Sequence, residues 1–292
     1  MERPGRLAAR SAGAAAIVAG VWLGGAGAVA AAGSAQTTHF SWSKASRHAL
    51  VTDLRTTLGQ DTVQLNASIQ VDEDSTGPVT IGVQGGVDLT KRAAALTVSG
   101  SGANGASILP IQEVLDGGTL YIDVPNGPWY SVPLTSIEQK IGVSGSLEGE
   151  SNPTQFLSLI AQQGGQVART GSATLPDGTP VTDYHVVSDL DAANQAHRPL
   201  TIDPAQLKQL ETALGSHTLA FDVAVDAQGR VRTLSSSMSL SPKALGAGNS
   251  AGPVAVDVTY SFSGYGTPVS VAPPPASSVQ PLPPSALSQL KI

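Results

Sequence analysis

The amino-acid sequence predicts an α+β fold, in which a few helices cover the concave, apolar face of an antiparallel sheet. Every second residue is apolar over residues 63–71, and the alternation resumes after a polar tip over residues 79–89. Similar alternating runs follow along the chain, separated by short turns. Alternation places the apolar side chains on one face of each strand, and short turns favour antiparallel neighbours. Because an apolar sheet face must be buried, we expect helices to lie on it.

The composition excludes several classes of function. The chain has 292 residues, enough for one large domain, which we expect over residues 37–271. It contains no cysteine, which excludes disulfides, thiolate metal sites and cysteine nucleophiles. Its formal charge of −6 argues against a nucleic-acid partner, which requires a basic face. Aromatic residues make up only 4% of the chain, and a sheet face of small aliphatic side chains is less able to fill its own interior.

The N-terminal residues 1–36 have the pattern of an export signal. Arg3, Arg6 and Arg10 precede an uncharged, Ala- and Gly-rich run that contains A-x-A-like cleavage sites at 28–30 and 30–32. This order is typical of a secretory signal peptide. The alternatives are an uncleaved single-pass membrane anchor, for which the run is long enough, and a disordered tail. The pattern predicts an exported protein of the cell envelope or the extracellular space.

Three segments are expected to be helical. Residues 41–58 have apolar side chains on one face at helical spacing, and Gly59 suits the end of such a helix. Two later segments, 152–164 and 203–215, each start with a capping residue followed by proline and end at glycine.

The predicted strands occupy most of the remaining chain, and the Pro-rich residues 272–292 are expected to form a disordered tail. After the hairpin of residues 63–71 and 79–89, strands are expected at 93–98, 108–115, 120–124, 166–175, 180–187, 219–225, 231–240 and 254–262, and a turn at 125–128 leads into Trp129 and Tyr130.

Motifs with catalytic or metal-binding chemistry lack their required context. Residues 100–105 match G-x-G-x-x-G, but no βαβ unit surrounds them, and a hairpin loop is the better interpretation. Residues 248–252 match G-x-S-x-G, but a strand follows and no histidine lies later in the chain. Residues 72–77 resemble the start of a calcium loop, but Val83 stands where the loop needs glutamate. We therefore predict no catalytic residue, no metal site and no cofactor.

The histidines offer no catalytic pair. Asp183 and His185 would lie on the same face of one strand, and we interpret them as a surface hydrogen bond. A secreted hydrolase, the least favoured alternative, would need a cleft that gathers His, Asp and Ser side chains.

Several stretches, in their order along the chain, resemble actinobacterial envelope lipoproteins of the LppX/LprG type, which are related to the periplasmic lipoprotein carrier LolA. They are DLT at 88–90, DGGTLYI at 116–122, GPWY at 127–130, PDGTPVTDYHV at 176–186, DAQGRV at 226–231 and YGTPVSVAP at 265–273. The resemblance implies a curved antiparallel half-barrel with helices across its mouth. It also implies a hydrophobic cavity that holds the acyl chains of lipids or lipoglycans. Members usually carry a lipobox cysteine, whereas here Ala26 follows Leu23-Gly24-Gly25 in its place, so the lipid anchor is missing.

The leading hypothesis is an exported lipid-binding or lipid-carrier protein, expected to be monomeric, with a membrane surface as a further candidate partner. The alternative is a non-enzymatic sensor or protein-interaction module on the same scaffold. Apolar residues of the alternating strands are expected to line the cavity, although packing against the helices explains each of them equally well. The predicted lining residues are Leu65, Ile69, Ile81, Val83, Ile122, Phe221, Val223, Val256 and Val258.

Overall fold

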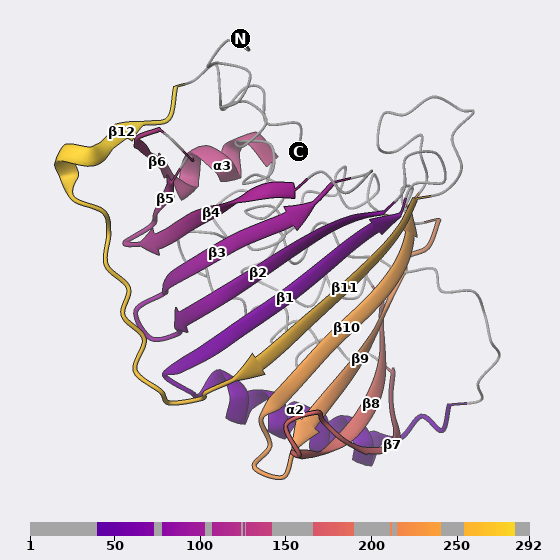
Figure 1. The fold of residues 1–292 in the computed structure, drawn as a ribbon. Helices are drawn as coiled ribbons and strands as arrows, with labels where there is room; N and C mark the ends of the chain where they lie inside the picture. Colours follow the sequence, from indigo (N-terminus) through magenta and orange to yellow (C-terminus); the bar gives the residue numbers. More distant parts are fainter. Residues whose placement is uncertain are drawn as a thin grey trace.

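The computed structural model describes residues 40–72, 78–102, 107–123, 125, 127–141, 166–189, 211, 215–240 and 254–283. These residues form one 12-stranded sheet with the strand order β12-β6-β5-β4-β3-β2-β1-β11-β10-β9-β8-β7 (Figure 1). All pairs are antiparallel except β12 with β6. Because β12 and β7 lie at opposite ends of this order, the sheet is open, as predicted for a half-barrel. The strands are β1 (Thr62–Asp72), β2 (Val79–Asp88), β3 (Ala93–Ser101), β4 (Ser107–Asp116), β5 (Thr119–Asp123), β6 (Trp129–Pro133), β7 (Gln166–Thr174), β8 (Pro180–Asp189), β9 (Thr218–Asp226), β10 (Val231–Leu240), β11 (Val254–Ser263) and β12 (Val279–Pro281).

The sheet is curved, and three irregularities in strand pairing contribute to its shape. The register shifts between Val98 and Gly100 in β3, between Arg169 and Gly171 in β7, and between Val231 and Thr233 in β10. An extra residue on one strand of a pair bends that strand and increases the local twist. The predicted fold class, a curved antiparallel sheet with few helices, is confirmed.

Helix α2 (Lys44–Leu58) matches the first predicted helix closely. Ser43 caps it, because its hydroxyl accepts a hydrogen bond from the backbone N–H of Ser46 at 2.9 Å. The backbone N–H of Gly59 donates to the carbonyl oxygen of Arg55 and closes the last turn. Leu50 and Leu54 are buried on the side that faces the sheet. In Figure 1, α2 lies beneath the β7–β10 half of the sheet.

A second helix, α3 (Leu134–Ile141), begins directly after β6 and was not expected from the sequence. Leu134 and Ile137 are buried in the core. The segments 152–164 and 203–215, predicted to be helical, lie almost entirely outside the described residues, as do the N-terminal residues 1–39 and the motif at 248–252.

The C-terminal segment corrects the expectation of a disordered tail for its described part. Residues 279–281 form β12, which pairs with β6, and Leu282 donates its backbone N–H to the carbonyl oxygen of Ser131 at 2.9 Å. Figure 1 shows the segment leaving β11, passing the ends of β1 and β2, and reaching β6 at the far edge. Two contacts fix its start, because Gly266 N–H donates to the carbonyl oxygen of Thr62 and the Thr62 hydroxyl donates to that of Thr267. The proline content of this segment argued against a strand. A three-residue strand at the edge of a sheet needs only a few free backbone groups, however, and tolerates a proline at its end.

Candidate functional site: the apolar face of the sheet

The strand register places all nine predicted lining residues on one face of the sheet. Residues directly opposite each other in a ladder share a face. Ile69 lies opposite Ile81 on β2 and opposite Val258 on β11, and the same face continues outward through both halves of the sheet. We call this surface the apolar face. Toward β6 the apolar face continues through Leu96, Glu113 and Ile122, each of which pairs with the next. Toward β7 it continues through Leu234 and its partner Val223.

All nine residues are buried. Their exposed fractions run from 1% for Val83, Phe221 and Val223 to 9% for Val256. They belong to one hydrophobic core, which also includes Leu50 and Leu54 of α2 and Leu134 and Ile137 of α3. The two helices therefore pack on the apolar face, α2 against β7 and β10 and α3 against β6. That the nine side chains contact a ligand stays a prediction.

The opposite face is polar along β1 and β2. Asn66 and Gln70 of β1 are exposed, and so is Gln84 of β2, whereas the preceding residue Val83 is buried on the apolar face. At one point this face is covered closely, because a Cβ built on Gly86 would lie 2.3 Å from Cγ1 of Val269. The C-terminal segment thus packs against bare backbone of β2.

One acidic residue interrupts the apolar face. Glu113 of β4 is 2% exposed, and its Oε1 atom has no hydrogen-bond partner. Burial raises the pKa of this carboxyl from 4.5 to about 8. The sequence contained a signal for it, since Ile111, Glu113 and Leu115 alternate on one face of the predicted strand. The interpretation of that run as simply apolar missed the residue.

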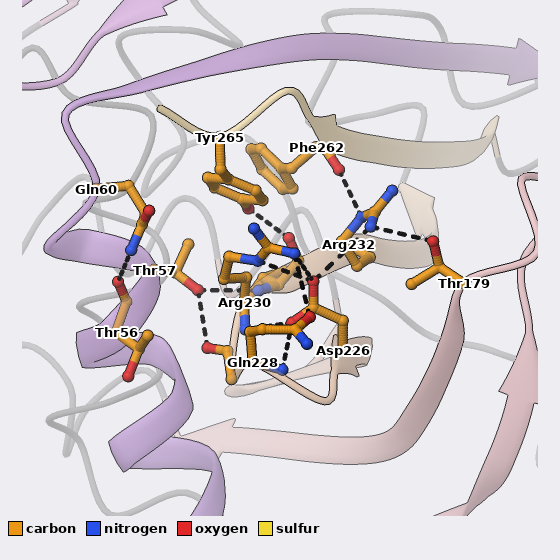
Figure 2. Close-up of polar contacts among 12 residues, drawn as sticks. Thr56, Thr57, Gln60, Thr179, Asp226, Gln228, Arg230, Arg232, Phe262 and Tyr265 are labelled. Atoms are coloured by element: carbon orange, nitrogen blue, oxygen red, sulfur yellow. Dashed lines mark hydrogen bonds and ion pairs between the residues drawn. The ribbon is translucent and has the colours of Figure 1, made fainter. Parts of the chain in front are cut away.

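A group of polar contacts lies at the turn between β9 and β10 (Figure 2). The side chain of Asp226 is fully buried; Oδ1 accepts the backbone N–H groups of Gln228 and Arg230, and Oδ2 lies 2.8 Å from the Arg230 guanidinium. Arg232 pairs with Asp177 at 2.6 Å and donates to the carbonyl oxygen of Phe262. These contacts join the β7–β8 turn, the β9–β10 turn and the end of β11.

The same cluster connects to α2 and to the C-terminal segment. The Thr57 hydroxyl accepts the backbone N–H of Val231 at 2.8 Å, and the Tyr265 hydroxyl donates to the carbonyl oxygen of Val231. Burial raises the pKa of Tyr265, so its hydroxyl keeps the proton that it donates. Since its acidic and basic side chains pair with one another, we interpret this cluster as structural.

His185 has a partner that the sequence did not indicate. Its Nδ1 atom lies 2.7 Å from Oδ1 of Asp222 on the neighbouring strand β9, and its ring stacks on Phe40 with centroids 4.2 Å apart. The expected partner Asp183 is therefore replaced by a residue that lies directly opposite in the ladder. Trp42 lies near the same ring, and His185 consequently belongs to an aromatic cluster beside the edge strand β7.

The described residues show neither a metal-binding cluster nor a membrane-spanning helix. Within the described ranges, no group of three or more histidine, aspartate or glutamate side chains is arranged to hold a metal ion. Among the helices in the part of the chain that the structure covers, none has the length and apolar character to cross a membrane.

Comparisons with known proteins give matches in structure and none in sequence. No protein-family model matches the chain, and no curated protein matches it. The chain is structurally similar to LprF. The match to LprF from Mycobacterium bovis has a TM-score of 0.43 at 13% identity and covers 80% of this chain and 99% of LprF. A putative outer membrane lipoprotein-sorting protein domain from Vibrio parahaemolyticus has a TM-score of 0.29 at 6% identity, with 78% and 94% covered. A LolA superfamily protein from Nitrosomonas europaea has a TM-score of 0.25 at 9% identity, with 81% and 96% covered.

Proposed function

We propose that this protein binds lipids in the cell envelope and holds their acyl chains against the apolar face of its curved sheet. The observation that supports this proposal most is the register, which gathers Leu65, Val83, Ile122, Phe221 and Val256 from five different strands onto one buried surface. Each methylene group that a ligand buries there contributes about 0.8 kcal/mol. A single acyl chain would thus bind without many polar contacts. The N-terminal pattern of residues 1–36 supports export.

The first experiment asks whether a lipid accompanies the protein. Protein purified from its own host without added detergent is analysed by native mass spectrometry and by organic extraction. We expect a mass increment that corresponds to an acyl lipid, and the same lipid in the extract. Protein that is free of lipid, and that takes up no fatty-acyl probe after purification, would contradict the proposal.

The second experiment locates the site. Val83→Thr and Val256→Thr preserve side-chain shape but place a hydroxyl on the apolar face. We expect each to weaken binding of an acyl probe by about tenfold, because an unpaired hydroxyl in an apolar lining costs roughly 1–3 kcal/mol. Gln84→Thr is the matched control, since Gln84 is adjacent to Val83 but exposed on the opposite face. Equal affinity of all three folded variants would refute this location.

A further inference from the structure

Glu113 lies among aliphatic residues on the apolar face. Its ladder partners are Leu96 on β3 and Ile122 on β5, and its own strand presents Ile111 and Leu115 on the same side. Side chains directly opposite in antiparallel strands have their Cβ atoms about 4.5–5.5 Å apart. These four aliphatic neighbours on the strands offer the carboxyl group no hydrogen bond.

Several other buried polar side chains of the sheet have partners, although the hydroxyl oxygen of Ser188 on β8 is buried without one. Ser236, which lies on the apolar face opposite Val258, donates its hydroxyl to the carbonyl oxygen of Ala220 at 2.8 Å. Asp226 accepts several hydrogen bonds and pairs with arginine. Glu113 Oε1, in contrast, is buried without a partner, an arrangement that is costly for a carboxyl group. A side chain that serves packing alone would be aliphatic here.

We propose that Glu113 is the polar anchor of the lipid site, and that its carboxyl O–H donates a hydrogen bond to the ester carbonyl oxygen of a bound acyl ester. This inference rests on the proposed function and adds the chemical class of the ligand. An ester carbonyl is a hydrogen-bond acceptor attached directly to an acyl chain, so one molecule would fill the apolar surface and satisfy Oε1. A plain hydrocarbon would leave Oε1 unpaired.

The protonation state of Glu113 agrees with a donor role. Burial raises the pKa of its carboxyl group to about 8, so this group is mainly neutral at pH 7. A neutral carboxyl has one O–H to donate, whereas a carboxylate only accepts. The anchor is therefore suited to a ligand with a hydrogen-bond acceptor, such as an ester carbonyl oxygen.

The test compares two ligands of similar length, methyl decanoate and dodecane, by displacement of a fluorescent acyl probe from the full protein at pH 7. We expect the wild-type protein to bind methyl decanoate about tenfold more tightly than dodecane, the contribution of one hydrogen bond to an otherwise unsatisfied buried group. Glu113→Leu should bind dodecane as well as the wild type does or better, and should lose the preference for the ester. Glu113→Gln should retain a preference, because the amide N–H also donates.

Two controls make the outcomes distinguishable. Ser236→Ala removes a polar group from the same face, but one already satisfied within the protein, and should leave the ester preference unchanged. Thermal unfolding confirms that each variant is folded. If the wild type binds neither ligand, the proposed function itself fails. If the wild type binds both, with a ratio that Glu113→Leu does not change, lipid binding stands and Glu113 is not its anchor.

Discussion

Gly85 occupies a position in β2 that has no room for a side chain. Its φ is +155°, and a Cβ built there would lie 2.0 Å from the backbone carbonyl oxygen of Ala95 on β3. A methyl group cannot approach a backbone oxygen so closely, so Gly85→Ala must push β2 and β3 apart. Only glycine lets the two backbones meet at this point of the sheet.

This predicts a large loss of stability for Gly85→Ala, about 3 kcal/mol or more, visible as a lower midpoint of urea unfolding. The matched control is Gly82→Ala on the same strand, where the nearest atom to the added Cβ is the Ser99 hydroxyl oxygen at 3.4 Å. Gly82→Ala should stay within about 1 kcal/mol of the wild type. Similar midpoints for the two variants would show that β3 moves aside at no cost.

Glu113 makes stability depend on pH in a defined direction. Its pKa is raised from 4.5 in the unfolded chain to about 8 in the fold. Between these two values the unfolded state has released the proton and the folded state retains it, so stability falls as pH rises. The slope expected from one such group is about 1.4 kcal/mol per pH unit, and it levels off above the folded pKa.

Glu113→Gln cannot ionise and should lack this contribution. We predict that the free energy of unfolding of Glu113→Gln exceeds that of the wild type by an amount that grows between about pH 5 and pH 8. Urea unfolding of both proteins at several pH values measures this difference. A difference that stays constant over the range would mean that Glu113 ionises freely in the fold.

At the scale of elements, Thr57 connects α2 to the β9–β10 turn. It is 1% exposed, and its hydroxyl accepts the Val231 N–H at 2.8 Å while donating to the carbonyl oxygen of Asp53. Thr57→Val retains the shape but leaves the Val231 N–H unpaired in the core. We predict a loss of about 1–3 kcal/mol in the free energy of unfolding.

The neighbouring Thr56 is the natural control for this prediction. Its side chain is exposed, and its hydroxyl donates within α2 to the carbonyl oxygen of Thr52. Thr56→Val should change stability by less than about 0.5 kcal/mol, as is usual for surface positions. If Thr57→Val changed stability as little as Thr56→Val does, a water molecule or a rearranged turn would have to accept the hydrogen bond of the Val231 backbone N–H.

Elements with a local signal were predictable from the sequence. Strand alternation predicted β1, β2 and β11 and also which side chains share a face, because paired strands align their alternation. The Ser43 cap and Gly59 lie where the sequence placed the limits of α2 within a few residues. These features depend on neighbours in the chain.

The features that the sequence did not reveal depend on distant partners. Helix α3 has only eight residues and starts where β6 ends, so it shows too few turns for a helical period. The bond of His185 to Asp222 depends on which strand lies beside β8. Residues 279–281 form a strand only because β6 offers a free edge. The orphaned atom of Glu113 likewise appears only once the opposite strands are known.

At the scale of the whole molecule, β12 protects one edge of the open sheet. It covers Trp129, Tyr130 and Ser131 of β6, and Pro281 at its end cannot donate a further ladder bond. Exposed edge strands are templates for pairing with another chain. A short strand that ends in proline therefore limits such pairing.

This predicts that a chain ending at residue 271 self-associates more than one ending at residue 283, which retains β12. Sedimentation velocity over a range of concentrations measures the difference, and circular dichroism confirms that both chains are folded. Equal sedimentation of the two would mean that the β6 edge does not recruit a second molecule.

The position of β11 has a consequence for the order of folding. This strand comes from the last part of the chain, yet it lies between β1 and β10 and joins the two halves of the sheet. Until residues 254–263 are available, β1 and β10 are both unpaired edges. Contacts between distant parts of a chain form slowly, because closing a long loop costs entropy before any pairing compensates for it. The strands from β1 to β6 and those from β7 to β10 therefore join only after the C-terminal residues are synthesised. Before that point the incomplete chain exposes two strand edges that can pair with other molecules.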